Sequence, residues 1–191
     1  GKTKIKYVNT TCNSWVAPAG GDNCKKCDDF ESCTEYKCKS LGQSCVFIPE
    51  NEGTNRISCI NQNPNDVNSP IISIWQENIT KGYNINLLSY GFELSPAIEP
   101  YQRISLGILT NEPSQCKYSK EHSIDFDDME EFFGDSFYDI KHSIALNSIP
   151  GSINQFYVKC KDANGNENNR DYLIQYSVKP GPDITPVIIE S

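Results

Sequence analysis

The cysteines are the residues of this chain whose type and spacing could do chemistry. Nine occur among 191 residues, and seven of them lie within the first 59 positions. Cysteines form structural disulfides, ligate metals or carry out redox chemistry, depending on spacing and surroundings. The full set is Cys12, Cys24, Cys27, Cys33, Cys38, Cys45, Cys59, Cys116 and Cys160. The density of the first seven is the feature that a fold must explain.

A metal site and a redox pair are the alternatives to disulfides. Cys24 and Cys27 have the two-residue gap that suits tetrahedral thiolate ligation of zinc. A zinc ribbon needs a second such pair, whereas Cys33 and Cys38 are four residues apart. The two lysines between Cys24 and Cys27 would favour a reactive thiolate, but no strand-to-helix unit accompanies them. Structural disulfides are therefore favoured, and we predict no metal and no cofactor.

Disulfides in the first part also predict where the protein resides. Residues 12–60 hold few large apolar side chains, so hydrophobic burial alone cannot stabilise them. Each disulfide adds about 2 to 4 kcal/mol, and disulfides persist in oxidising surroundings. We predict an extracellular or cell-surface location. A structural bridge between Cys116 and Cys160 leaves an odd cysteine, which would pair with another chain or with a segment outside this one.

The elements that must position the later cysteines are strands. Alternating apolar and polar residues separated by turn signals recur from position 70 onward. The predicted fold class is mainly β, a small disulfide-rich module followed by an immunoglobulin-like β-sandwich. A short helix is expected at 125–133, and an Asn-Gly hairpin at 162–169. The predicted strands are 71–76, 83–94, 101–110, 115–119, 137–146, 153–161 and 171–178.

Composition divides the chain into five segments. The turn-rich polar stretch after position 60 is the clearest internal boundary, and a stiff proline-rich stretch follows position 178. We expect the chain to be a piece of a longer protein. The predicted segments are an N-terminal strand or arm (1–11), a cysteine-rich disulfide module (12–60), a linker (61–70), the sandwich (71–178), and a linker with the start of a further strand (179–191).

Charge excludes one class of partner. The net charge is −8, whereas a nucleic-acid-binding protein needs a basic surface to neutralise phosphates. No stretch approaches the ~20 apolar residues that a membrane span requires. The acidity is local, because eight carboxylates lie between Glu121 and Asp139. Such a patch attracts cations or a basic partner, or is a solvated face.

Other candidate sites carry weaker signals. Asp162, Asn164, Asn166 and Asn168 alternate like the ligands of a calcium loop, but the hairpin explains the same residues. The acidic cluster at 125–131 is the better ion attractor, with a solvated face as the default. His122 and His142 are isolated and interpreted as surface or structural residues. Two glycosylation sequons occur, at Asn9 and Asn78.

Five runs of residues are distinctive: 15–27 and 33–45 in the cysteine-rich module, and 110–119, 157–166 and 181–186 beyond it. Through these runs the chain resembles a group of long, multidomain secreted or surface proteins of small-genome archaea. These proteins carry a cysteine-rich module and immunoglobulin- or fibronectin-III-like domains. The resemblance implies a modular envelope, surface-layer or filament protein and no catalytic residues.

The sequence therefore predicts a non-catalytic structural module of an extracellular assembly, such as a surface layer, sheath or filament. Copies would associate with one another or with other surface proteins through strand edges and opposite charge. One alternative is a cell-surface adhesion or carbohydrate-binding module, in which Tyr36, Tyr101 or Tyr138 would stack on glycans. Another is an accessory domain of a larger secreted hydrolase. No catalytic motif is present, so we predict that the chain is not an enzyme.

Overall fold

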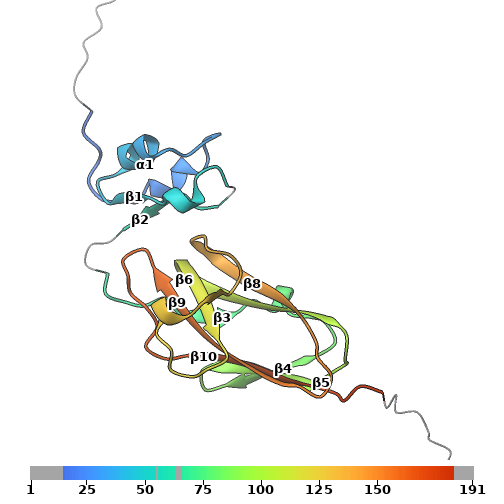
Figure 1. The fold of residues 1–191 in the computed structure, drawn as a ribbon. Coiled ribbons are helices and arrows are strands. Elements are labelled where there is room, and N and C mark those ends of the chain that lie inside the picture. Colours follow the sequence, from blue (N-terminus) through green and yellow to red (C-terminus); the bar gives the residue numbers. More distant parts are fainter. Residues whose placement is uncertain (1–14, 55, 63–65, 183–191) are drawn as a thin grey trace, which may run out of the picture.

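The computed structural model describes residues 15–54, 56–62 and 66–182. The fold is mainly β, as predicted. A small disulfide-rich module lies at one end of a β-sandwich, and the last described residues leave the sandwich at the other end (Figure 1). Cys12, Asn9 and the predicted N-terminal arm lie outside the described residues, and so does the strand expected after residue 186.

The module is built from short elements joined by disulfides. The helix α1 (Glu35–Leu41) begins after Thr34, whose hydroxyl accepts a hydrogen bond from the backbone N–H of Lys37 at 3.4 Å. Its strands β1 (Cys45–Phe47) and β2 (Cys59–Asn61) pair antiparallel. Two 3₁₀ turns complete it, η1 (Cys24–Cys27) and η2 (Pro49–Asn51). The disulfides are Cys24–Cys45, Cys27–Cys33 and Cys38–Cys59.

These three disulfides form the centre of the module. All six cysteines are buried, and among the described residues Leu41 and Phe47 are the partly buried hydrophobic side chains that pack against them. The described module cysteines thus pair with one another, as structural disulfides require. The module replaces a hydrophobic core with cross-links, as small secreted scaffolds commonly do.

The sandwich is one curled eight-stranded sheet. Its strands follow the order β3-β6-β9-β10-β5-β4, and β7 and β8 also pair with β6. The first half of the long strand β6 lies between β3 and β8, and its second half lies between β7 and β9. The curled sheet forms the two layers of the sandwich, and β6 takes part in both of them. The bounds are β3 (Ile72–Ile74), β4 (Asn84–Leu88), β5 (Gly91–Ile98), β6 (Arg103–Ser119), β7 (Glu131–Phe132), β8 (Asp139–Asn147), β9 (Ile153–Asp162) and β10 (Tyr172–Val178).

The core follows the alternation of the strands. In β10 the residues Tyr172, Ile174, Tyr176 and Val178 are buried, and the residues between them are more exposed. Strand β10 pairs antiparallel with β9 and parallel with β5. The predicted hairpin between β9 and β10 is present, with Gly165 at φ +90°. The last strand is thereby held on both sides.

Two strand predictions differ from the structure. The stretch predicted as one strand at 83–94 is the hairpin β4–β5, whereas the strands predicted at 101–110 and 115–119 are the single strand β6. The residues between 110 and 115 are not a break between two strands. They instead lie where β6 passes from one layer to the other, because its register with β8 shifts between Leu109 and Ser114.

The helix predicted at 125–133 is wrong. This stretch forms a 3₁₀ turn, η4 (Phe126–Asp128), followed by the short strand β7. Phe126, Met129 and Phe133 are all buried, so the apolar spacing does mark a covered face. Strand β7 hydrogen-bonds to the end of β6, and its extended backbone supplies partners to an edge that a helix would leave open.

Candidate functional site

The junction of the two parts is organised by one buried asparagine. Asn51 ends η2 and is fully buried. Its Nδ2 donates to the carbonyl oxygen of Tyr138 at 2.6 Å and to that of Ile57 at 2.7 Å. Its Oδ1 accepts from the backbone N–H of Tyr138 at 3.2 Å. One side chain therefore satisfies both backbone groups of Tyr138, much as a neighbouring strand would.

An arginine reinforces the same contact. Arg56 donates from one guanidinium nitrogen to Asp139 Oδ2 at 2.7 Å and from the other to Asp135. Its guanidinium carbon also lies 4.9 Å from the centroid of the Phe137 ring. The module contributes the cation and the sandwich contributes the carboxylates. Since Arg56 is partly exposed, each ion pair adds at most about 1 kcal/mol.

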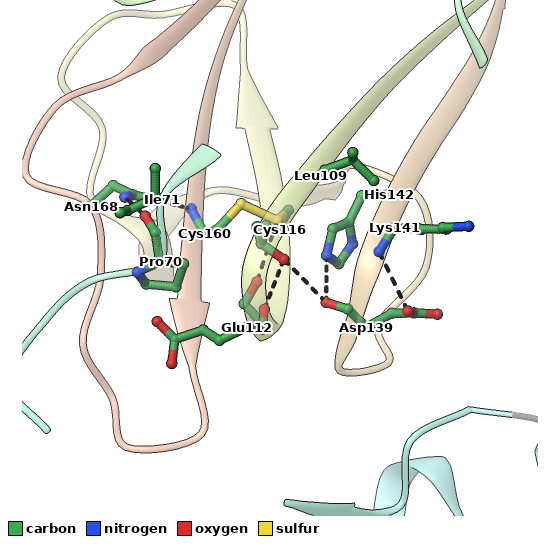
Figure 2. Close-up of a disulfide and its surroundings, with 12 residues drawn as sticks. Pro70, Ile71, Leu109, Glu112, Cys116, Asp139, Lys141, His142, Cys160 and Asn168 are labelled. Carbon is green, nitrogen blue, oxygen red and sulfur yellow. Dashed lines mark hydrogen bonds between the residues drawn. A yellow bond between two sulfur atoms is a disulfide. The ribbon is translucent and has the colours of Figure 1, made fainter. Parts of the chain in front are cut away.

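The sandwich side of the junction is held by the disulfide between β6 and β9. Cys116 and Cys160 face each other directly across the two strands and are bonded, the bridge that the sequence led us to expect. Figure 2 shows Asn168 beside this disulfide. The Oδ1 of Asn168 accepts from the Cys160 N–H at 2.9 Å, and its Nδ2 donates to the Pro70 carbonyl oxygen. The hairpin is thereby tied to the segment that arrives from the module.

A buried histidine lies next to the same disulfide (Figure 2). His142 Nε2–H donates to the carbonyl oxygen of Asp139 at 2.9 Å. Burial lowers the pKa of His142, because a charged imidazolium would lose its hydration there. The carboxylate of Asp139 meanwhile receives Arg56. Asp139 thus connects the imidazole inside the sandwich to the cation of the module.

A cleft of about 420 Å³ opens between the two parts beside this junction. The carboxylates of Asp66, Glu112 and Asp162 lie along it, with oxygens within 4.8 Å of one another. Desolvation, and then the charges of Asp162 and Asp66, raise the pKa of Glu112. Oxygen donors are what calcium prefers, so these residues are the ones that could hold a hard cation.

The calcium-loop pattern in the sequence picked out only one of these three carboxylates. Asp162 Oδ1 accepts backbone hydrogen bonds from Asn164 and Asn166, both at 2.8 Å, so the hairpin itself uses the loop residues. Asp66 and Glu112 come from the linker and from β6, and no local motif marks them. Only the fold brings the three together.

The other residues singled out from the sequence are scattered. Tyr36 lies exposed on α1, Tyr101 lies exposed between β5 and β6, and Tyr138 is half-buried at the junction. They do not form one aromatic platform. Asn78 lies half-buried at the end of η3 (Gln76–Asn78). His122 is exposed, in a loop between β6 and η4.

Fold and junction define a class, a disulfide-rich module fixed to an immunoglobulin-like sandwich. No protein-family model matches this chain, and no curated protein or solved structure matches it. None of the helices in the described ranges is long and apolar enough to cross a membrane.

Proposed function

We propose that this chain is a non-catalytic structural module of an extracellular assembly, such as a surface layer, sheath or filament. The junction built on Asn51 carries the proposal, because it joins the two parts through backbone hydrogen bonds inside a buried contact. A unit of fixed shape is what a repeating assembly requires. The module and the exit of the described chain lie at opposite ends of the sandwich, which suits end-to-end arrangement (Figure 1).

The cross-links support the extracellular part of the proposal. The described residues contain four disulfides, three in the module and one in the sandwich. Disulfides at this density persist in oxidising surroundings. Glycans on the sequon at Asn78 would fit the same location, and intact mass measurement of protein from its native source would reveal them.

An open strand edge supplies the contact between copies. Within the described residues β4 pairs only with β5, so one row of its backbone groups has no strand partner. The strand carries no charge and no proline, the devices that usually protect an edge. Leu87 on β4 is 77% exposed. A second copy that pairs with this edge would satisfy the backbone and cover the leucine.

The test is the mass of the protein in solution as a function of concentration. We expect sedimentation and light scattering to show growing oligomers for the natural chain. Leu87→Lys should abolish the growth, because a charge on the edge strand opposes pairing. Tyr36→Lys is the matched control, since Tyr36 is 76% exposed but lies on the helix α1 and not on a strand edge. A monomer over the whole accessible concentration range contradicts the proposal.

A further inference from the structure

A lysine and an aspartate are buried together on the two strands of the β9–β10 hairpin. Lys159 on β9 and Asp171, directly before β10, lie one step beyond the paired residues Val158 and Tyr172. Their side chains are 6% and 4% exposed. Lys159 Nζ lies 3.9 Å from Asp171 Oδ1, beyond hydrogen-bonding distance. Asp171 Oδ1 is buried without a hydrogen-bond partner in the described part of the chain.

This arrangement is an unusual way to bury two charges. A buried ion pair is stable only when close contact and further hydrogen bonds repay the loss of hydration. Here the facing oxygen has no hydrogen bond, although its ammonium partner is near. Folding has thus brought an amine and a carboxyl together in a place where both charged forms are costly. Loss of both charges would remove that cost.

Three neighbouring groups lie close enough to the pair to donate hydrogen bonds to it or to exchange protons with it. The backbone N–H of Ser123 donates to Asp171 Oδ2 at 2.8 Å. His122 Nε2 lies 3.4 Å from the same oxygen. Asp125 Oδ1 lies 3.7 Å from Lys159 Nζ. Ser123 adopts φ +65°, a conformation that side-chain-bearing residues seldom adopt and that directs its N–H at the carboxyl.

We propose that Lys159 and Asp171 condense to an amide, an intramolecular isopeptide cross-link between β9 and β10. The Nζ atom attacks Cγ of the Asp171 carboxyl, and a C–N bond forms. One C–O bond breaks, and the oxygen leaves as water. The overall change is one ammonium and one carboxylate converted to one amide and one water, with no oxidant or reductant.

Each neighbour has a definite part in this step. The Asp125 carboxylate takes the proton that makes the Lys159 amine nucleophilic. The Ser123 N–H stabilises the negative charge that develops on the carboxyl oxygen, as donors of an oxyanion hole do. Because the Ser123 N–H and His122 Nε2 both face Asp171 Oδ2, Oδ2 stays as the amide oxygen. Oδ1 leaves as water, with the protons that Asp125 passes on from Lys159 Nζ. The four-carbon stem of lysine is flexible enough to bring Nζ from its present distance to bonding distance.

The cross-link would close the hairpin that carries Asp162 and Asn168. Unlike the disulfide nearby between Cys116 and Cys160, an amide survives reducing agents. The inference stands apart from the proposed structural function, because its chemistry is complete within one chain. It would nevertheless add a permanent bond to the sandwich, which would bear mechanical load in the proposed assembly.

The experiment is intact mass spectrometry of the folded chain, reduced and denatured after incubation at neutral pH. We expect a mass lower than that of the sequence by one water. A tryptic digest should then join residues 142–161, uncleaved after Lys159, to the peptide that begins at Asp171. The full sequence mass after prolonged incubation overturns the proposal. Loss of water mapped to any single peptide overturns it as well.

Variants separate this bond from other dehydrations. Lys159→Arg keeps the charge and should show the full sequence mass, whereas the control Lys161→Arg should still lose water. Lys161 is the matched residue because it is on the same strand and pairs instead with Asp127. Asp171→Asn should lose ammonia instead of water. Water loss that persists in Lys159→Arg contradicts the proposal, and the ammonia loss tests the same bond if Lys159→Arg fails to fold.

Discussion

Replacement of Asn51 by alanine tests whether the two parts form one unit. The substitution removes the amide that contacts Tyr138 and leaves the module disulfides and Arg56 in place. Three side-chain hydrogen bonds disappear, two of them across the junction and one to Ile57 within the module. The hydrophobic and covalent parts of both domains are unchanged, so the effect reports the junction.

The size of the effect follows from the bonds lost. A hydrogen bond contributes about 1 kcal/mol net, so three give about 3 kcal/mol. About 2 kcal/mol of this belongs to the two bonds with Tyr138. A change of 3 kcal/mol lowers the melting temperature of a chain this long by about 6 to 12 °C. Loss of the 2 kcal/mol from the two bonds with Tyr138 should raise the equilibrium constant for opening of the junction roughly thirtyfold. The exchange rate of an amide protected by the junction should rise by the same factor.

Hydrogen exchange of the Tyr138 amide is the direct assay. That N–H donates to Asn51 Oδ1 in the structure, so its exchange reports opening of the junction. We expect Asn51→Ala to raise its exchange rate by the factor above. Asn84→Ala is the matched control, because Asn84 is an exposed asparagine on β4 far from the junction. Amides in the middle of β9 and β10 should keep their protection in both variants.

Two results would refute this reasoning. Unchanged exchange at Tyr138 in Asn51→Ala would mean that the amide is protected by something other than the junction. A melting temperature equal to that of Asn84→Ala would mean that the buried hydrogen bonds contribute nothing to the fold. Either result would also remove the observation that carries the proposed structural function.

Three further substitutions test the sandwich. Joint replacement of Cys116 and Cys160 by serine should cost about 4 kcal/mol in urea unfolding, because the bridge closes a sequence separation of 44 residues. Gly91→Ala should disrupt the pairing of β5 with β10, since its Cβ would lie 1.9 Å from the Leu173 carbonyl oxygen on β10. Gly82→Ala is the control, because Gly82 has a positive φ but open space around it, so its cost is that of the backbone conformation alone. Burial lowers the pKa of His142, so stability should fall as the pH drops below about 6.5, and His142→Gln should remove this slope.

Alternation and turn chemistry were sufficient to predict much of the sandwich. Strand β10 shows every second residue buried, and the Asn-Gly turn joins it to β9 as expected. Lys159 shows where this reasoning fails. Its place in the alternation of β9 predicts an outward side chain, yet it is buried along with both of its neighbours. The connection that carries Asp125 covers that face, and a long connection of this kind leaves no periodic signal.

The junction could not be predicted because its partners are distant in the chain. Asn51 and Tyr138 are separated by 87 positions, and Arg56 and Asp139 by 83. An asparagine after proline and glutamate reads as an ordinary turn residue. Nothing local indicates that its amide is buried against another domain. The cysteine pattern, by contrast, predicts the disulfide module from the sequence alone, because seven clustered cysteines with few apolar neighbours require cross-links.

The acidic stretch between Glu121 and Asp139 suggested a basic partner, but the fold uses half of it internally. Four of its eight carboxylates pair with cations of the same chain: Asp125, Asp127, Asp135 and Asp139. Less charge remains for contacts between copies, so any assembly should rest on the β4 edge. We therefore expect the oligomers to persist in 1 M salt, where the screening length is about 3 Å. Dissociation by salt in sedimentation measurements would instead show that opposite charge holds the copies together.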